Sequence, residues 1–199
     1  MLSDDELKRV WEATEDDLFG KRVKLLILTG QRAGEIASLS RDMVRKEVVT
    51  LPSWLTKNRR EHTFPLGAMA AEVMAGLSLP ARGAYKARAF ENYQRLKARL
   101  DKASGVTEWT LHDLRRTFAS GLAAQGVSLP AIERLLNHVS GSFAGIVGVY
   151  QHYNFMPEMG RAIMLWETHV AALVRHGEPT LPLIAKPAPR LLPDLRQGG

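Results

Sequence analysis

Cysteine is absent from the 199 residues of this chain. Its absence excludes disulfide bonds, thiolate zinc sites, iron–sulfur clusters and cysteine nucleophiles, because all of these need a cysteine sulfur atom. Long apolar runs are absent as well: no stretch reaches the roughly 20 residues that span a bilayer, and Leu-Ser-Asp-Asp rather than a basic segment follows Met1. We therefore expect no membrane-spanning helix, no secretory signal and a cytoplasmic location.

The loops that commonly bind nucleotides are missing too. Neither GxGxxG nor GxxxxGKS or GxxxxGKT occurs. The GxSxG motif, which carries a nucleophilic serine in α/β-hydrolases, is absent as well. The six histidines form no HExxH motif, and no two of them stand four residues apart, as two metal ligands on one helix face would. The sequence thus predicts neither a metal site nor a cofactor.

Positive charge is concentrated in the middle of the chain. The net charge is +6, yet residues 1–20 hold seven acidic and two basic residues. Residues 82–102 hold seven basic and two acidic residues, and residues 41–64 hold six basic and three acidic ones. This distribution is typical of a nucleic-acid-binding face, although it is equally compatible with an ordinary solvated helix surface.

Helical patterns dominate the sequence. Ser3 and Glu6 form a capping box that starts the first helix, and Thr29-Gly30 is a stop signal for the second. Ser128 and Pro130 are typical of another helix start. The expected helices cover about residues 4–14, 18–28, 33–39, 68–77, 85–102, 112–124, 129–137 and 157–175.

Two short β-prone segments interrupt the helices. Val48–Leu51 and His62–Leu66 flank the polar, turn-like stretch Lys57–Arg60 and predict a hairpin or a three-stranded sheet. Pro65 restricts the second segment to a sheet edge or a strand end. The expected fold is therefore α+β and mostly helical, with a small antiparallel β-sheet beside a helical core.

The end of the chain has a different composition. Five prolines separate short apolar pieces within residues 177–199. We expect one domain over residues 1–176, followed by a proline-rich tail over residues 177–199.

One segment has the residue types that suit a phosphate. In Thr110-Leu-His-Asp-Leu-Arg-Arg-Thr-Phe-Ala-Ser, His112 and Arg115 stand three residues apart and share one helix face. A guanidinium group binds two phosphate oxygens, and an imidazole exchanges a proton near neutral pH. By itself this spacing is common and favours a plain helix start. Further candidates follow helix ends or lie in turns: Arg32, Lys57, His138 and Tyr150.

Taken in order, these residues and their surroundings resemble the tyrosine recombinase family, of the phage integrase type. The resemblance covers about residues 1–170 and implies that family's catalytic-domain fold. Its pieces are TGQRAGEIASL around Arg32, TKN around Lys57, HTFPL at the end of the hairpin, TLHDLRRTFAS around His112 and Arg115, LLNHVSG around His138, and GVYQHY around Tyr150.

The resemblance implies a mechanism without metal or ATP. Tyr150 would attack a DNA phosphodiester, form a 3′-phosphotyrosyl bond and expel a 5′-hydroxyl. Arg32 and Arg115 would stabilise the charge on the phosphate oxygens. Lys57 would protonate the 5′-oxygen, His112 would assist proton transfer with the tyrosine, and His138 would donate a hydrogen bond to the phosphate. Tyr153 is the alternative nucleophile.

Residues around these positions have expected supporting roles. Glu35, three residues after Arg32, would pair with that guanidinium group and fix its position. The positions expected to contact DNA are Arg59, Arg60, Lys86, Arg88 and Arg116. The four tryptophans, Trp11, Trp54, Trp109 and Trp166, fall on apolar positions typical of a core or an interface.

The resemblance leads to a site-specific DNA recombinase, bacterial or phage-encoded. Its expected partners are double-stranded DNA and further copies of the chain: a tetramer on DNA, with a monomer possible when free. The tail would pack on a neighbouring subunit, and the family's N-terminal core-binding domain is expected to be absent. The alternatives are a nicking and resealing enzyme resembling type IB topoisomerases, and a non-catalytic DNA-binding protein of the same fold.

Overall fold

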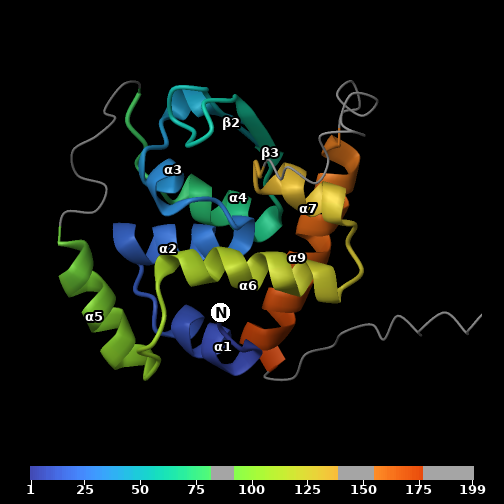
Figure 1. Ribbon diagram of the computed structural model, residues 1–199. Helices are drawn as coiled ribbons and strands as arrows, with labels where there is room; N and C mark the ends of the chain where they lie inside the picture. Colours follow the sequence, from blue (N-terminus) through green and yellow to red (C-terminus); the bar gives the residue numbers. More distant parts are fainter. Residues whose placement is uncertain (82–91, 139–154, 177–199) are drawn as a thin grey trace, which may run out of the picture.

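Helix α2 (Leu18–Thr29) lies at the centre of the computed structural model, which describes residues 1–81, 92–138 and 155–176. Its residues Leu25 to Thr29 are all buried. The helix packs against α4 (Ala68–Ala75), α6 (Leu111–Ala124) and α9 (Met156–His176), so a single apolar core forms around it. Figure 1 shows these helices crossing at different angles rather than aligned as a bundle.

The N-terminal helix closes one side of this core. Helix α1 (Asp4–Glu12) begins at the predicted capping box, in which the Ser3 hydroxyl and the Glu6 carboxylate each accept a hydrogen bond from the other residue's backbone N–H. The helix packs against α9 and against α5 (Tyr93–Ser104), and Leu7 and Val10 are its buried side chains.

The end of α2 leads directly to the candidate site. Gly30 adopts a left-handed conformation with φ of 63° and ends the helix, as the sequence predicts. A Cβ atom at this position would lie 2.3 Å from Cδ1 of Phe118, so only glycine fits beneath that ring. The short helix α3 (Ala33–Ala37) then begins immediately after Arg32.

The predicted sheet has three antiparallel strands in the order β1-β2-β3. A turn of 3₁₀ helix over Arg41–Met43 precedes β1 (Val44–Arg45), and β2 (Val48–Leu51) pairs with β3 (His62–Pro65). Leu51 faces His62 across the ladder, and both are buried. Pro65 ends the edge strand, which is one of the two positions that the sequence allows for it.

Helices α6 and α9 pack through aromatic side chains. The Trp166 ring of α9 packs edge-on against Phe118 of α6, with ring centroids 5.5 Å apart. The Trp166 indole N–H donates to the carbonyl oxygen of Ile27 in α2, at 2.8 Å. Helix α7 (Leu129–Leu135) packs against both α6 and α9, with Pro130 in its first turn.

The α+β class predicted from the sequence is confirmed, and one predicted helix is wrong in its extent. Among the described residues, the helix expected over 85–102 begins only at Tyr93, as α5, and Asn92 directly before it has φ of 63°. A residue in the left-handed region interrupts the α-helical hydrogen-bond pattern. The helix also continues to Ser104, two residues past its expected end.

Some sequence predictions fall outside the described residues. These are the two candidate nucleophiles Tyr150 and Tyr153, the basic residues Lys86 and Arg88, and the tail 177–199. Among the helices that are described, none combines the length and the apolar character needed to cross a membrane.

Candidate functional site

Arg32 precedes α3, in the first of the segments that form the site. Its Nη1 donates to Oε1 of Glu35 at 3.0 Å, and its backbone N–H donates to the other carboxylate oxygen at 3.3 Å. The Glu35 side chain is buried, whereas 22% of the Arg32 side chain is exposed. The ion pair therefore fixes a guanidinium group of which one part remains open to a ligand.

Arg115 lies in α6 and is held by two backbone carbonyl groups. Its Nη1 donates to the carbonyl oxygen of Gly30 at 2.9 Å, and its Nη2 donates to that of Leu136. Burial, together with the nearby charge of Arg32, lowers the pKa of the Arg115 guanidinium to about 10. At neutral pH Arg115 therefore stays positively charged, with three of its five N–H groups left for other acceptors.

His112 lies one helical turn before Arg115 and is exposed. The pKa of His112 is lowered, first by partial burial and then by the charges of Arg116, Arg115 and Arg32. The charge of Asp113 acts in the opposite direction and raises this pKa. His112 is therefore largely neutral at physiological pH, and it lies close enough to Arg32 and Arg115 to sense both charges. The Asp113 carboxylate accepts from the Thr110 backbone and hydroxyl, so it caps α6.

A buried polar network that the sequence did not reveal supports the two arginines. His62 Nε2 lies 3.0 Å from the carbonyl oxygen of Leu135 and 3.1 Å from Oε1 of Gln31. Since both partners are acceptors, His62 carries a proton on Nε2. The Gln31 amide in turn donates to the carbonyl oxygens of Thr29 and Leu135. The network ties the end of α2 to the end of α7.

The burial of His62 has a strong electrostatic consequence. Desolvation, with smaller contributions from the charges of Arg115 and Arg32, lowers the pKa of His62 to about 4. The imidazole is therefore neutral at physiological pH. A neutral ring at this position adds no repulsion to the two buried or half-buried guanidinium groups.

The turn between β2 and β3 contacts the end of α7 through two asparagines. Asn58 Nδ2 donates to Oδ1 of Asn137 at 2.8 Å and to its carbonyl oxygen at 3.1 Å, and Asn137 Nδ2 donates back to Oδ1 of Asn58 at 3.2 Å. Lys57 and His138 are the direct neighbours of these two residues in sequence, and both are exposed. The contact therefore brings the Lys57 turn beside the start of the His138 segment.

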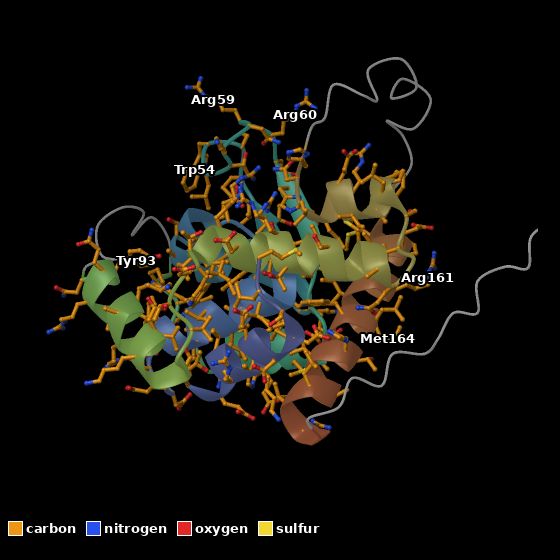
Figure 2. The ribbon with its side chains drawn as sticks, turned by 60° about the horizontal axis from the view of Figure 1, so that its bottom comes forward. Trp54, Arg59, Arg60, Tyr93, Arg161 and Met164 are labelled. Carbon is orange, nitrogen blue, oxygen red and sulfur yellow. The ribbon has the colours of Figure 1, made fainter. Side chains whose placement is uncertain are left out.

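The tip of the same turn is positively charged. Figure 2 shows Arg59 and Arg60 extending outward from it, away from the helices. Trp54 also lies in this turn and is 56% exposed, so of the two positions expected for it, core or interface, the structure excludes the core. Arg116 projects from α6 with a side chain that is 65% exposed and pairs with Asp113 at 3.1 Å.

Together these segments form a cationic site suited to an anion. Arg32, Arg115 and His112 come from the start of α3 and from α6, and the His62 network holds the loops between them. Delocalised guanidinium groups in partly buried surroundings bind phosphate oxygens strongly. Within the part of the chain that the structure describes, no group of three or more histidine, aspartate or glutamate side chains could hold a metal ion.

Known proteins resemble this chain in sequence and in fold. A sequence model described as the phage integrase family matches residues 1–156. The solved structure of XerA recombinase superposes with a TM-score of 0.57 at 23% identity, over 84% of this chain and 62% of that one. The catalytic domain of bacteriophage HP1 integrase superposes with a TM-score of 0.56 at 19% identity, over 88% of this chain and 94% of that domain. No curated protein matches the sequence.

Proposed function

Because this chain belongs to the phage integrase family, we propose that it cleaves and rejoins DNA strands at specific sites through a covalent 3′-phosphotyrosine intermediate. The substrate is double-stranded DNA, and exchange between two duplexes takes place in a tetramer of the chain. Since the chain spans only 62% of the length of XerA recombinase, these activities of a whole protein belong to the proposal.

The observation that carries this proposal is that Arg115 of α6 donates to the carbonyl oxygen of Gly30, two residues before Arg32, which brings Arg32 to the helix that carries Arg115 and His112. In the transition state the phosphorus atom is bound to both the incoming and the leaving oxygen, and negative charge builds up on the non-bridging oxygens. Two fixed guanidinium groups supply the positive charge that a metal ion supplies in other phosphoryl-transfer enzymes. His138, at the end of α7, donates a further hydrogen bond to the phosphate.

The proposed reaction is balanced in bonds and protons. The phenolic oxygen of Tyr150 forms a bond to phosphorus while the bond from phosphorus to the 5′-oxygen breaks. The phenol transfers its proton with the assistance of His112, whose lowered pKa leaves it neutral and able to accept. Lys57 donates a proton to the leaving 5′-oxygen. The reverse steps rejoin a strand, so the bond energy is conserved without a nucleotide cofactor.

The test is the capture of the covalent intermediate. A pool of duplexes with randomised sequence carries a nick a few nucleotides beyond the central position, so that cleavage releases a short 5′-hydroxyl oligonucleotide and traps the adduct. We expect a protein–DNA adduct that survives denaturation, and sequencing of the trapped DNA identifies the preferred site. Absence of an adduct with every member of the pool contradicts the proposed function.

The two tyrosines are separated by substitution. We expect Tyr150→Phe to abolish the adduct, because a phenyl ring offers no nucleophilic oxygen, while Tyr153→Phe retains it. The reverse pattern, with the adduct lost only in Tyr153→Phe, assigns the nucleophile to Tyr153. Mass spectrometry of a nuclease-treated adduct provides an independent assignment, since the modified peptide carries the phosphate.

A further inference from the structure

We propose that the amide pair of Asn58 and Asn137 positions Lys57 for proton donation to the leaving 5′-oxygen. This inference rests on the proposed function, in which Lys57 is the general acid. Neither asparagine contacts the DNA phosphate in this proposal. Both act through the backbone of the turn that carries Lys57.

The geometry of the pair is reciprocal. Each amide donates to the side-chain oxygen of the other, at 2.8 and 3.2 Å, and Asn58 also reaches the carbonyl oxygen of Asn137 at 3.1 Å. Both side chains are half-buried, which limits competition from water. Three hydrogen bonds over a sequence separation of 79 residues fix the position of Asn58, and Lys57 directly precedes it.

The end of α7 is the fixed side of this contact. The carbonyl oxygens of Leu135 and Leu136 accept hydrogen bonds from Gln31, His62 and Arg115, all of which are buried. Asn137 follows these two residues directly. Its φ of 47° places it in the left-handed region after the helix, and its amide meets Asn58 of the β2–β3 turn.

The β2–β3 turn is the other side of this contact. The Thr56 hydroxyl donates to the carbonyl oxygens of Ser53 and Arg60, and the Arg60 backbone N–H donates to Oδ1 of Asn58. These bonds shape the turn internally without attaching it to the helices. The Asn58–Asn137 pair attaches the turn to the segment after α7. The pair lies next to Lys57, whose position determines whether it can protonate the 5′-oxygen.

Proton donation is sensitive to such an attachment. A general acid must come within hydrogen-bond distance of the oxygen that it protonates, and a displacement of about 1 Å can slow a reaction on the order of a hundredfold. The lysine ammonium group stands on a flexible stem of four carbon atoms, so it can occupy many positions. A fixed backbone reduces the number of positions that the ammonium group can reach.

The test compares two leaving groups in the same nicked duplex. One substrate has the natural 5′-oxygen at the cleavage position, and the other has sulfur in its place. A thiolate leaves without protonation because its conjugate acid has a pKa near 8.5, whereas an alkoxide does not. Loss of the general acid therefore slows cleavage at oxygen and spares cleavage at sulfur.

Asn137→Gly is the most informative variant. Glycine accepts the positive φ of this position, so the backbone path to His138 is preserved while both side-chain hydrogen bonds are removed. Asn58→Ala removes the pair from the other side, and the double variant tests whether the two losses are additive. Lys57→Met serves as the reference for complete loss of the proton donor.

We expect Asn137→Gly to slow cleavage at oxygen by about ten- to a hundredfold and to leave cleavage at sulfur close to the unmodified rate. Asn58→Ala should share this pattern, and the double variant should be no slower than the slower single one. Equal slowing on both substrates overturns the inference, because it indicates a disturbed phosphate site at His138. Unchanged rates on both substrates overturn it as well.

Failure of the proposed function has a different signature. In that case the unmodified chain forms no adduct with either substrate. A second outcome is that the unmodified chain cleaves both substrates and Lys57→Met slows both equally. In that case Lys57 is not the proton donor, and the positioning role of the two asparagines is contradicted as well. Thermal unfolding of each variant confirms that a rate is compared between folded proteins.

Discussion

At the scale of single residues, the site depends on buried polar groups that pair with backbone carbonyl oxygens. Arg115 and His62 both lie in surroundings that disfavour an extra charge, and both donate to carbonyl oxygens near the end of α7. A buried donor without an acceptor would cost about 1–3 kcal/mol, so these pairings fix the relative position of α2, α6 and α7. The charge of Arg115 is retained because its pKa of about 10 is far above neutral pH.

The stability of the fold should depend on pH through His62. Its pKa rises from about 4 in the folded chain to its ordinary value of 6.5 on unfolding, so the unfolded chain binds more protons between these values. The stability of the folded chain that is linked to neutral His62 is fully present above pH 6.5 and is lost as the pH falls toward 4. We expect the free energy of unfolding to decrease by about 2 kcal/mol between about pH 7 and pH 5.

Urea denaturation at a series of pH values measures this effect. His62→Gln removes the titrating group and retains an amide that can donate to Leu135, so its free energy of unfolding should vary less over the same range. The comparison concerns the change with pH and not the absolute stability. An equal pH dependence in both proteins would show that His62 does not titrate as its burial implies.

At the scale of elements, small residues decide how closely the helices approach. A Cβ atom on Gly121 of α6 would lie 2.2 Å from Cζ3 of Trp166, the indole that also donates to α2. By contrast, among the described residues a Cβ atom on Gly160 of α9 would have no neighbour within 4 Å outside its own stretch of helix. The two glycines lie in helices and differ only in their surroundings.

The same substitution at these two positions should have opposite effects. We expect Gly121→Ala to destabilise the fold by about 1–3 kcal/mol, because the buried Trp166 ring must move. Gly160→Ala should stabilise it by about 0.5–1 kcal/mol, since alanine has the higher helix propensity and meets no obstacle. Thermal unfolding of the two variants beside the unmodified chain measures both, and a loss of stability in each would contradict the contrast.

At the scale of the whole molecule, basic residues of α5 lie beside the acidic N-terminal segment, where Arg99 pairs with Glu15 and Asp17, while the β2–β3 turn carries positive charge away from that segment. The acidic N-terminal residues cluster in and around α1, whereas Arg59 and Arg60 project from the β2–β3 turn, on the opposite side of the molecule in Figure 1. Salt screens such a separation over a Debye length of about 8 Å at physiological ionic strength. Binding of DNA to the basic side should therefore weaken as salt increases.

The contribution of the turn to DNA binding can be measured directly. Because each phosphate contact releases about one counterion, Arg59→Ala with Arg60→Ala should reduce the slope of log affinity against log salt by about two. Lys102→Ala, at an exposed position near the end of α5, is the matched control and should leave the slope unchanged. Fluorescence anisotropy of a labelled duplex gives the slopes, and equal values for all three proteins would exclude the turn from the interface.

Local signals in the sequence predicted much of this fold. Ser3 with Glu6, Gly30, Ser128 with Pro130, and Pro65 mark the ends of elements because capping and backbone restriction act within a few residues. The exception was the helix before Lys102, where a run of helix-forming residues gave no sign that Asn92 takes a left-handed conformation. Glu35 lay within reach of Arg32 for the same local reason, and the two form an ion pair.

The partners of the site could not be predicted in this way. Gln31, His62 and Leu135 meet across separations of 31 to 104 residues, and Asn58 meets Asn137 across 79. The sequence by itself determined the helical class, the ends of the elements and the order of the residues that resemble the family, because these follow from short-range physics and motif spacing. Only the tertiary structure decided which polar groups lose their water and pair with one another, because burial depends on how all the elements pack together.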